Sequence, residues 1–192
     1  MKERRTRLLL EIALTIALAA VLSMITIWRM PQGGSVSLGM LPLFVLAFRR
    51  GLMPGLVAGG LYGLVDLMVD PFPPVHWIQP ILDYPVAYLL VGLAGVVTVA
   101  LRTELQTGRT RRVALLLAAG IAVGSAGRYL AHFVSGMVFF GEFAPPGQPV
   151  WLYSALYNLY VPISAIACFA AAVVVVPALA GILPVSEDGT PR

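Results

Sequence analysis

The last apolar stretch of the chain, residues 151–183, reads WLYSALYNLYVPISAIACFAAAVVVVPALAGIL and contains no Asp, Glu, Lys, Arg or His. A helix of about 20 apolar residues is long enough to cross the hydrocarbon core of a bilayer. The stretch is continuously apolar and lacks the alternation of a transmembrane β-strand. It therefore predicts a membrane-spanning helix, and the rest of the sequence has the same character.

The composition of the whole chain agrees with this assignment. Only 11% of its 192 residues are charged, against about 25% in an ordinary soluble domain, and 59% are hydrophobic. The mean hydropathy is +0.88. A soluble domain of this size still exposes about a third of its surface, and this sequence is too apolar to face water over so large an area. We therefore expect an all-α integral membrane protein whose partner is the lipid bilayer.

The apolar stretches predict one domain of six transmembrane helices over residues 1–192. The approximate spans are 8–28, 38–50, 52–69, 76–101, 113–140 and 151–183. The second stretch is shorter than the others, so it is predicted to be a short, tilted or partly re-entrant helix. Clusters of Pro and Gly at 31–34, 71–74 and 144–147 separate the spans on one side of the membrane.

Basic residues predict the orientation. If the six helices alternate in direction, eleven of the 13 Lys and Arg residues fall on the side opposite the Pro and Gly clusters; Arg29 and Arg128 are the exceptions. Because cytoplasmic loops carry the excess of Lys and Arg, both termini are predicted to be cytoplasmic. The net charge of +4 is explained by this asymmetry and gives no reason to expect nucleic acid as a partner.

Polar residues inside the spans are costly and therefore candidates for function. In the fourth span they share one helical face, in the fifth they recur every four residues, and tyrosines open the sixth. The three groups are His76, Gln79 and Asp83; Arg128, His132, Gly136 and Phe140; and Tyr153, Tyr157 and Tyr160 with Asn158. All lie toward the outer ends of their helices, so we expect them to meet at one depth around a polar pocket.

Simpler readings remain open for each of these residues. Asp83 and Arg128 can form an interhelical ion pair, His132 can be a satisfied core residue, and Gly136 can serve close packing. The tyrosines can belong to an interfacial aromatic belt. Asp66 and Asp70 are expected to cap or hydrate the outer end of the third span. A shared pocket would suit a flat, cationic, heteroaromatic ligand, because carboxylates balance positive charge and aromatic faces favour cations.

Four motifs in this sequence resemble a known family. They are MPQGGS at 30–35, QPILDY at 79–84, RYLAHFVSGMVFF at 128–140 and YSALYN at 153–158. Together they resemble the thiamine-specific substrate-binding components of the energy-coupling factor transporters, which are vitamin importers of bacteria. The resemblance runs over nearly the whole chain, and it implies a multi-pass protein of the bacterial cytoplasmic membrane.

The resemblance implies a set of thiamine-binding residues. The pocket carboxylate is Asp83, where family members often have Glu, with Tyr84 beside it; the stacking ring is Phe140, where some members have Trp. The remaining positions implied as ligand-binding are Arg128, His132, Gly136, Tyr153 and Asn158. Gln79 is also predicted to bind ligand, because it shares a helical face with Asp83. The loop of about residues 29–37, including Gln32, Gly33 and Gly34, corresponds to the outer gate. No cofactor, metal site or catalytic residue is expected, and with Cys168 as the single cysteine no multi-Cys metal site is possible.

Energy for transport would have to come from other proteins. Lys2 is the only lysine, so the chain has no Walker A motif. Ala13 and Ala17, with Ala20 one turn further on, form a small-residue face that permits close helix approach. The resemblance implies that this face docks against a transmembrane coupling protein joined to two ATPase subunits, although intrachain packing explains the spacing equally well.

Three alternative functions are kept for comparison. The chain can be a component for a different vitamin, or a proton-coupled secondary transporter that uses Asp83, Arg128 and His132 as a relay, although no internal repeat is visible. An intramembrane hydrolase is a third alternative, because Ser125, Ser135 and Ser154 accompany His132. Against it, the sequence contains no G-x-S-x-G or H-E-x-x-H motif.

Overall fold

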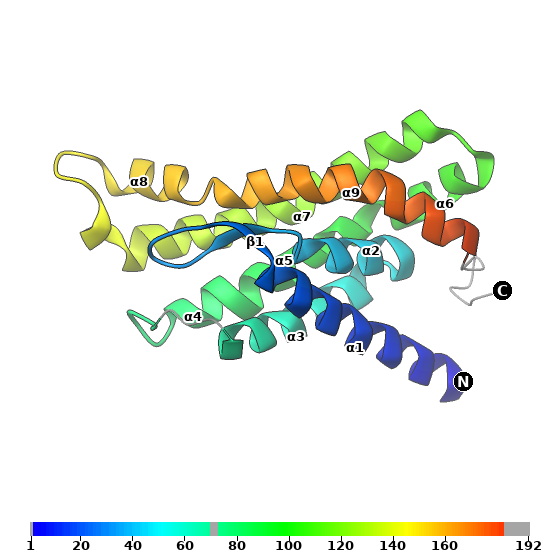
Figure 1. The fold of residues 1–192 in the computed structure, drawn as a ribbon, viewed down its shortest axis with the longest axis horizontal. Helices are drawn as coiled ribbons and strands as arrows, with labels where there is room; N and C mark the ends of the chain where they lie inside the picture. Colours follow the sequence, from blue (N-terminus) through cyan, green and yellow to red (C-terminus); the bar gives the residue numbers. More distant parts are fainter. Residues whose placement is uncertain (1, 70–72, 183–192) are drawn as a thin grey trace.

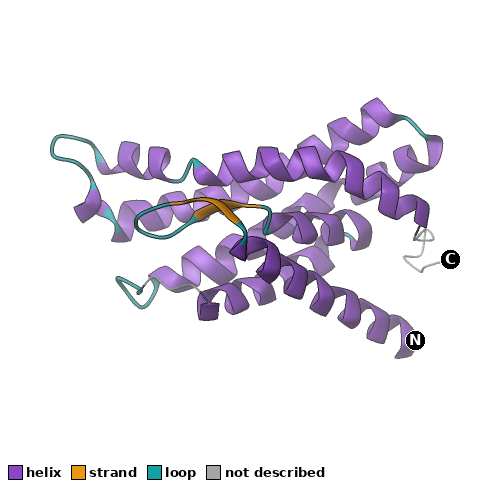
Figure 2. Ribbon diagram, in the orientation of Figure 1, coloured by secondary structure: helices purple, strands orange, loops and turns teal. Residues whose placement is uncertain are grey.

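The structure, a computed structural model, describes residues 2–69 and 73–182 and consists almost wholly of helices (Figures 1 and 2). In chain order the elements are α1 (Lys2–Met24), β1 (Thr26–Arg29), β2 (Ser35–Ser37), α2 (Met40–Arg50), α3 (Leu52–Val69), α4 (Gln79–Ile81), η1 (Leu82–Val86), α5 (Ala87–Val91), η2 (Gly92–Val97), α6 (Thr98–Thr107), α7 (Thr110–Phe139), η3 (Gly141–Phe143), α8 (Val150–Tyr157) and α9 (Tyr160–Ile182). Asp70, considered above, lies outside the described residues.

Five helical stretches of the described chain are long and apolar enough to cross a membrane. They are Glu3–Met24, Leu52–Val69, Gln79–Thr107, Thr110–Phe139 and Val150–Ala180. Helix α2 has only 11 residues, which rise about 16 Å, roughly half of a hydrocarbon core. The stretch predicted to be short is therefore a half-length helix, which runs back toward the end of the molecule where α1 begins (Figure 1).

The predicted first span, 8–28, is too long, because α1 ends at Met24 and a strand follows. Strand β1 pairs antiparallel with β2, with Trp28 opposite Val36 and Arg29 opposite Ser35. Residues 25–28 are β-branched or aromatic, which suits a strand. The turn between the strands needs φ values of +88° at Gly33 and +84° at Gly34, which glycine adopts without strain. The strands differ from the all-α fold that was predicted from the sequence.

The predicted fourth span also begins too early. Its helix starts at Gln79 rather than 76 and runs through a π-helical turn, η1, and a 3₁₀ segment, η2. Pro85 lies inside η1; it has no N–H to donate, and its ring crowds the preceding turn, so the helix widens locally. His76 precedes the helix and is exposed. The predicted face of His76, Gln79 and Asp83 is therefore wrong at His76.

The last stretch is divided into α8 and α9 by a break at Asn158 and Leu159. Pro162 cannot donate to the carbonyl of Asn158 four residues earlier. Instead the Val161 N–H bonds that carbonyl at 3.0 Å, a tighter turn than the α-helix makes. The break places Asn158 at the inner end of α8, where its side chain faces α7.

Helix α2 lies in the interior of the bundle, where Leu43, Phe44 and Ala47 are fully buried. Beside it, α3 packs closely against the fourth span through glycines at every fourth position. A Cβ at Gly59 or Gly63 would overlap the backbone of Tyr88 or of Tyr84 and Pro85. Such close approach is what small residues permit between membrane helices. It holds the π-helical turn and its polar residues against α3.

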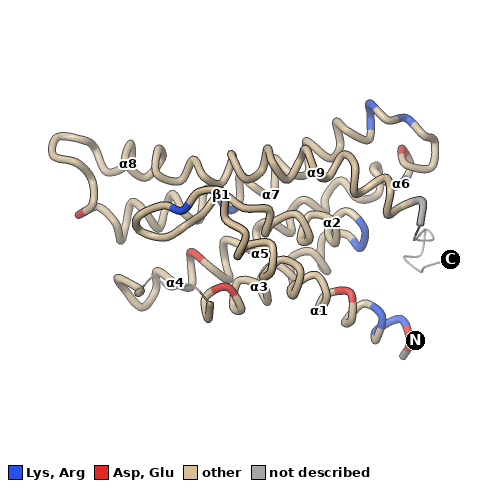
Figure 3. Tube along the Cα trace, in the orientation of Figure 1, with Lys and Arg blue, Asp and Glu red and all other residues tan. Residues whose placement is uncertain are grey.

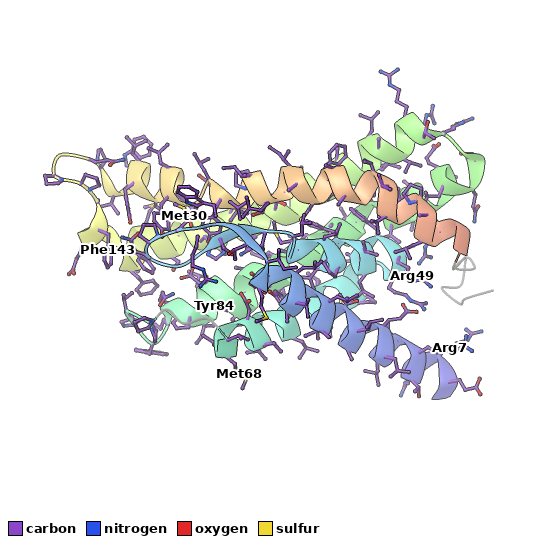
Figure 4. All side chains as sticks on the ribbon, viewed as in Figure 1. Arg7, Met30, Arg49, Met68, Tyr84 and Phe143 are labelled. Carbon is purple, nitrogen blue, oxygen red and sulfur yellow. The ribbon has the colours of Figure 1, made fainter. Side chains whose placement is uncertain are left out.

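The two ends of the molecule differ in charge. Lys and Arg gather at the end where α1 begins and α9 finishes, together with the α6–α7 connection (Figure 3). Arg7 and Arg49 lie at this end, and Phe143 lies at the opposite one (Figure 4). Glu11 of α1 accepts two hydrogen bonds from Arg50 at this end, at 2.6 and 2.5 Å.

Candidate functional site

A cavity of about 280 Å³ is lined by the β1–β2 loop, the ends of α1 and α3, the start of the fourth span, and residues of α7, α8 and α9. All nine residues predicted to bind ligand line it: Gln79, Asp83, Tyr84, Arg128, His132, Gly136, Phe140, Tyr153 and Asn158. Gln32, Gly33 and Gly34 of the predicted gate line it as well. The volume is at the lower end of the usual range for small-molecule sites, about 300–1,000 Å³, and therefore suits a ligand of vitamin size.

The carboxylate of Asp83 is held from three sides. Its Oδ1 lies 3.0 Å from Nδ1 of His132. Its Oδ2 accepts hydrogen bonds from Ser135 Oγ at 2.9 Å and from Gln79 Nε2 at 2.6 Å. Three side chains thus hold this one carboxylate and place an acidic group at the wall of the cavity.

His132 lies between Asp83 and Arg128. Nε of Arg128 is 3.2 Å from Nε2 of the imidazole. A guanidinium can only donate, so Nε2 accepts and the ring proton lies on Nδ1, facing Asp83. In the part of the chain that the structure describes, Asp83 and Arg128 are thus linked through the imidazole, and the direct ion pair considered above is replaced by this arrangement.

Arg128 is held in turn by the fourth span. Its Nη2 donates to the hydroxyl of Tyr88 at 3.0 Å, and its guanidinium lies 4.2 Å from the centre of the same ring. Asp66 also lines the cavity, and the Tyr62 hydroxyl donates to its Oδ1 at 2.9 Å. Asp66 was expected only to cap or hydrate its helix end, and the structure places it in the site.

Gly136 allows α7 and α8 to approach each other. A Cβ at this position would overlap the Oγ of Ser154 and come within 3.4 Å of Nδ2 of Asn158. Ser154 Oγ donates to the carbonyl of Phe133 at 2.8 Å, and Asn158 Nδ2 donates to that of Ser154 at 2.9 Å. The first hydrogen bond holds Ser154 against α7, and the second holds the amide of Asn158 at the wall of the cavity.

The β1–β2 loop covers the cavity and is fastened to α8. The Tyr157 hydroxyl accepts from the Gln32 N–H at 2.8 Å and donates to the Gly33 carbonyl at 3.0 Å. Beneath the loop, the ring of Tyr160 lies so close to Gly34 that a Cβ there would come within 2.7 Å of it. In the view of Figure 4, Met30 is labelled above the ribbon of this loop and Tyr84 of η1 below it. We refer to residues 26–37 as the lid.

The charges around the cavity leave its interior negative. Asp66 and Asp83 contribute two carboxylates, whereas Arg128 is the buried cation among the described lining residues. Arg29 of the lid also lines the cavity but is exposed to solvent. With aromatic faces from Tyr84, Phe140 and the tyrosines of α8, the site suits a flat cation.

Some of the predicted residues lie elsewhere. His76 stacks on Phe139, with ring centres 5.1 Å apart, at the exposed end of the fourth span. Ala13 and Ala17 are exposed on α1 and do not line the cavity, whereas Ala20, one turn further on, does. Ser135 donates to Asp83 and Ser154 to a backbone carbonyl, so neither hydroxyl is directed at His132 as a hydrolase would require.

Tyr88 and Asp66 line the cavity although the sequence did not place them there, and Tyr157 and Tyr160, expected at the pocket, were not assigned to ligand binding. The spacing of Tyr84 and Tyr88, four residues apart, was the available signal for Tyr88. Tyr157 and Tyr160 belong to the tyrosine series noted above, but their contacts with the lid depend on a loop 125 residues away.

This chain is similar to known proteins over most of its length. A family model described as "Thiamine transporter protein (Thia_YuaJ)" matches residues 9–183. A protein of Bacillus subtilis named thiamine transporter ThiT is 40% identical over 152 residues, which cover 78% of this chain and 79% of the relative. A protein of Lacticaseibacillus paracasei with the same name is 34% identical over 153 residues, covering 78% and 76%. A solved structure of ThiT from Listeria monocytogenes superposes with a TM-score of 0.80 at 28% identity, covering 94% of this chain and 97% of the other.

Proposed function

The chain belongs to the thiamine transporter protein family, and we propose that it is the thiamine-binding subunit of an ATP-driven vitamin importer of the energy-coupling factor type. In this proposal it lies in the cytoplasmic membrane of a bacterium, captures thiamine from outside and delivers it inward. A transmembrane coupling protein and two ATPase subunits supply the energy. The chain itself catalyses no reaction.

The observation that carries the proposal is the negative, aromatic cavity centred on Asp83. Thiamine joins a cationic thiazolium ring to an aminopyrimidine ring. Two carboxylates against one buried guanidinium leave a negative charge for the thiazolium to balance, and this attraction is strong in a site from which water is excluded. Tyr84, Phe140 and Tyr153 offer ring faces, while His132 and Asn158 offer polar atoms that orient the ligand.

The lid accounts for capture. With Tyr157 fastening its tip, residues 26–37 close the outer side of the cavity. A ligand enclosed in this way leaves only when the lid opens, which favours slow dissociation. A capture subunit that must hold a scarce vitamin until its partners act needs this property.

Titration of the purified protein in detergent tests the proposed ligand. Isothermal titration calorimetry with thiamine is expected to show tight binding with one site per chain. Riboflavin and biotin serve as comparison ligands, because components for other vitamins can share the helical body and differ in pocket residues. Tight binding of either comparison ligand with no heat from thiamine would overturn the assignment.

Energy coupling is tested separately. Ala13 and Ala17 lie on the exposed face of α1, so the double substitution Ala13→Leu, Ala17→Leu should prevent close docking of another helix. We expect thiamine affinity to stay within about twofold of the unaltered protein, while ATP-dependent uptake in vesicles containing the partner subunits is lost. Uptake driven by a proton gradient in vesicles without those subunits would instead support the secondary transporter.

A further inference from the structure

Gln79, the first residue of α4, is a buried amide at the wall of the cavity. Its side chain is 5% exposed, and the residue lines the cavity beside Asp83. Nε2 donates to Oδ2 of Asp83 at 2.6 Å. Within residues 2–69 and 73–182, the other end of the amide, Oε1, is buried and receives no hydrogen bond.

The orientation of this amide follows from its partner. A carboxylate can only accept hydrogen bonds when it is charged, so the amide nitrogen, and not the oxygen, must face Asp83. Turning the amide over would place two oxygens against each other. Oε1 is therefore held away from Asp83 and cannot satisfy itself by rotation.

A buried acceptor without a donor costs about 1–3 kcal/mol, and such groups in folded proteins call for a partner. Asp83, in contrast, already receives hydrogen bonds on both oxygens. The neighbouring acceptor that has no donor is the amide oxygen of Gln79. Its N–H bond to a carboxylate also polarises the amide, which makes this oxygen a stronger acceptor.

We propose that Gln79 determines specificity by accepting, at Oε1, a hydrogen bond from an N–H or O–H group of the bound vitamin. This inference rests on the proposed function and goes beyond it, since it assigns one atom to the recognition of a ligand donor. Thiamine carries two such donors, the amino group of its pyrimidine ring and the hydroxyl of its hydroxyethyl arm. The site would then reject a ligand that lacks the donor, because Oε1 would stay unpaired.

Two thiamine analogues separate the two donors. In one, an oxo group replaces the pyrimidine amino group; in the other, an ethyl arm replaces the hydroxyethyl arm. Dissociation constants for thiamine and both analogues are measured by calorimetry on the unaltered protein and on Gln79→Met, which keeps the length of the side chain and removes its amide. We expect the unaltered protein to bind one of the analogues at least about tenfold more weakly than thiamine. In Gln79→Met that ratio should fall to within about twofold of one.

Ser135→Ala is the matched control. It removes the other donor to Oδ2 of Asp83 and leaves the Gln79 amide in place. If Gln79 only positions Asp83, both variants weaken thiamine and the analogues by the same factor, and the ratios do not change. Should Gln79→Met fail to fold, Gln79→Asn withdraws the amide by one methylene and is measured in its place.

The outcomes are distinct. The proposal is supported if the Gln79 variant no longer distinguishes thiamine from the analogue while Ser135→Ala still does. The analogue that is affected then identifies the donor. Unchanged ratios, or an unaltered protein that binds thiamine and both analogues alike, overturn it. Failure of the unaltered protein to bind thiamine at all would instead refute the proposed function.

Discussion

At the scale of single residues, Asp83 is the centre of the site because both oxygens of its carboxylate are held by hydrogen bonds from neighbouring side chains. Each of its bonds comes from a different kind of donor, an imidazole, a hydroxyl and an amide. These donors orient the carboxylate before any ligand arrives, so little reorganisation accompanies binding. Asp is one methylene shorter than the Glu that the family often has at this position. Its three hydrogen bonds hold the shorter side chain in place at the cavity wall.

The substitution Asp83→Asn tests the role of this charge. It removes the negative charge and turns an N–H₂ group toward donors that previously found an acceptor. We expect thiamine binding to weaken by one to a few kcal/mol, the size of a charge-assisted hydrogen bond in a dry site. Calorimetry measures the change, and Glu142→Gln, which neutralises an exposed carboxylate in η3, should leave the affinity as it was.

Equal affinity for thiamine in Asp83→Asn and in the unaltered protein would show that the ligand lies elsewhere. His132→Ala gives an independent check, because it removes both the donor to Asp83 and the acceptor for Arg128. It should weaken binding by a similar amount.

At the scale of elements, the tip of the lid is bonded to α8 by the hydroxyl of Tyr157. The Tyr157 hydroxyl of α8 bonds two neighbouring residues at the tip of the lid, Gln32 and Gly33. The lid also contributes Val36 to a small apolar cluster with Tyr160 and Val161. The apolar contacts survive removal of the hydroxyl, whereas both hydrogen bonds are lost.

Tyr157→Phe is therefore expected to speed thiamine release. Loss of two hydrogen bonds, each with a net value of about 1 kcal/mol, should raise the dissociation rate roughly thirtyfold and change the association rate little. Stopped-flow fluorescence measures both rates. Tyr129→Phe is the matched control, because it removes a tyrosine hydroxyl bonded to the Ala155 carbonyl at 2.9 Å, outside the lid. Equal release rates for the two variants would exclude Tyr157 as the fastening residue.

The packing of α3 against the fourth span gives a second prediction at this scale. A Cβ at Gly59 would overlap the carbonyl of Tyr88, whereas one at Gly60 would meet only side-chain atoms of Leu89, at 3.6 Å or more. Gly59→Ala is therefore expected to lower stability by about 1–3 kcal/mol, as overpacking does. Gly60→Ala should be neutral or stabilising by up to about 1 kcal/mol, because alanine favours a helix.

Thermal unfolding in detergent measures both glycine variants under the same conditions. Because Tyr88 holds Arg128, Gly59→Ala should also weaken thiamine binding, while Gly60→Ala should not. Equal unfolding midpoints for the two variants would contradict the close approach of the two helices.

At the scale of the whole molecule, most Lys and Arg residues gather at the end where α1 begins (Figure 3), whereas the cavity is lined by the last residues of α1 and by the β1–β2 loop. Lys and Arg at the end where α1 begins are expected to face the cytoplasm. The cavity and its lid then face the exterior, from which the vitamin arrives. This orientation is the one that a capture subunit needs.

Cysteine labelling tests the orientation. Cys168 is buried and can be replaced by Ala; single cysteines are then introduced as Pro146→Cys, before α8, and Thr107→Cys, at the end of α6, both at exposed positions. On intact cells a membrane-impermeant maleimide should modify the first and not the second. After permeabilisation both should react. The reverse pattern on intact cells would mean that the protein is inserted the other way round.

The sequence by itself determined the membrane class, the approximate positions of the long helices and most of the polar residues that line the cavity. These properties are local along the chain, since hydropathy over 20 residues and spacing along a helix do not depend on what lies opposite. Only the tertiary structure decided that His132 stands between Asp83 and Arg128, that Tyr157 fastens the lid and that the Gln79 oxygen is left without a donor. Those contacts depend on how helices are rotated and how closely they approach, and that geometry is altered by the proline in η1, the break before α9 and the strands between α1 and α2.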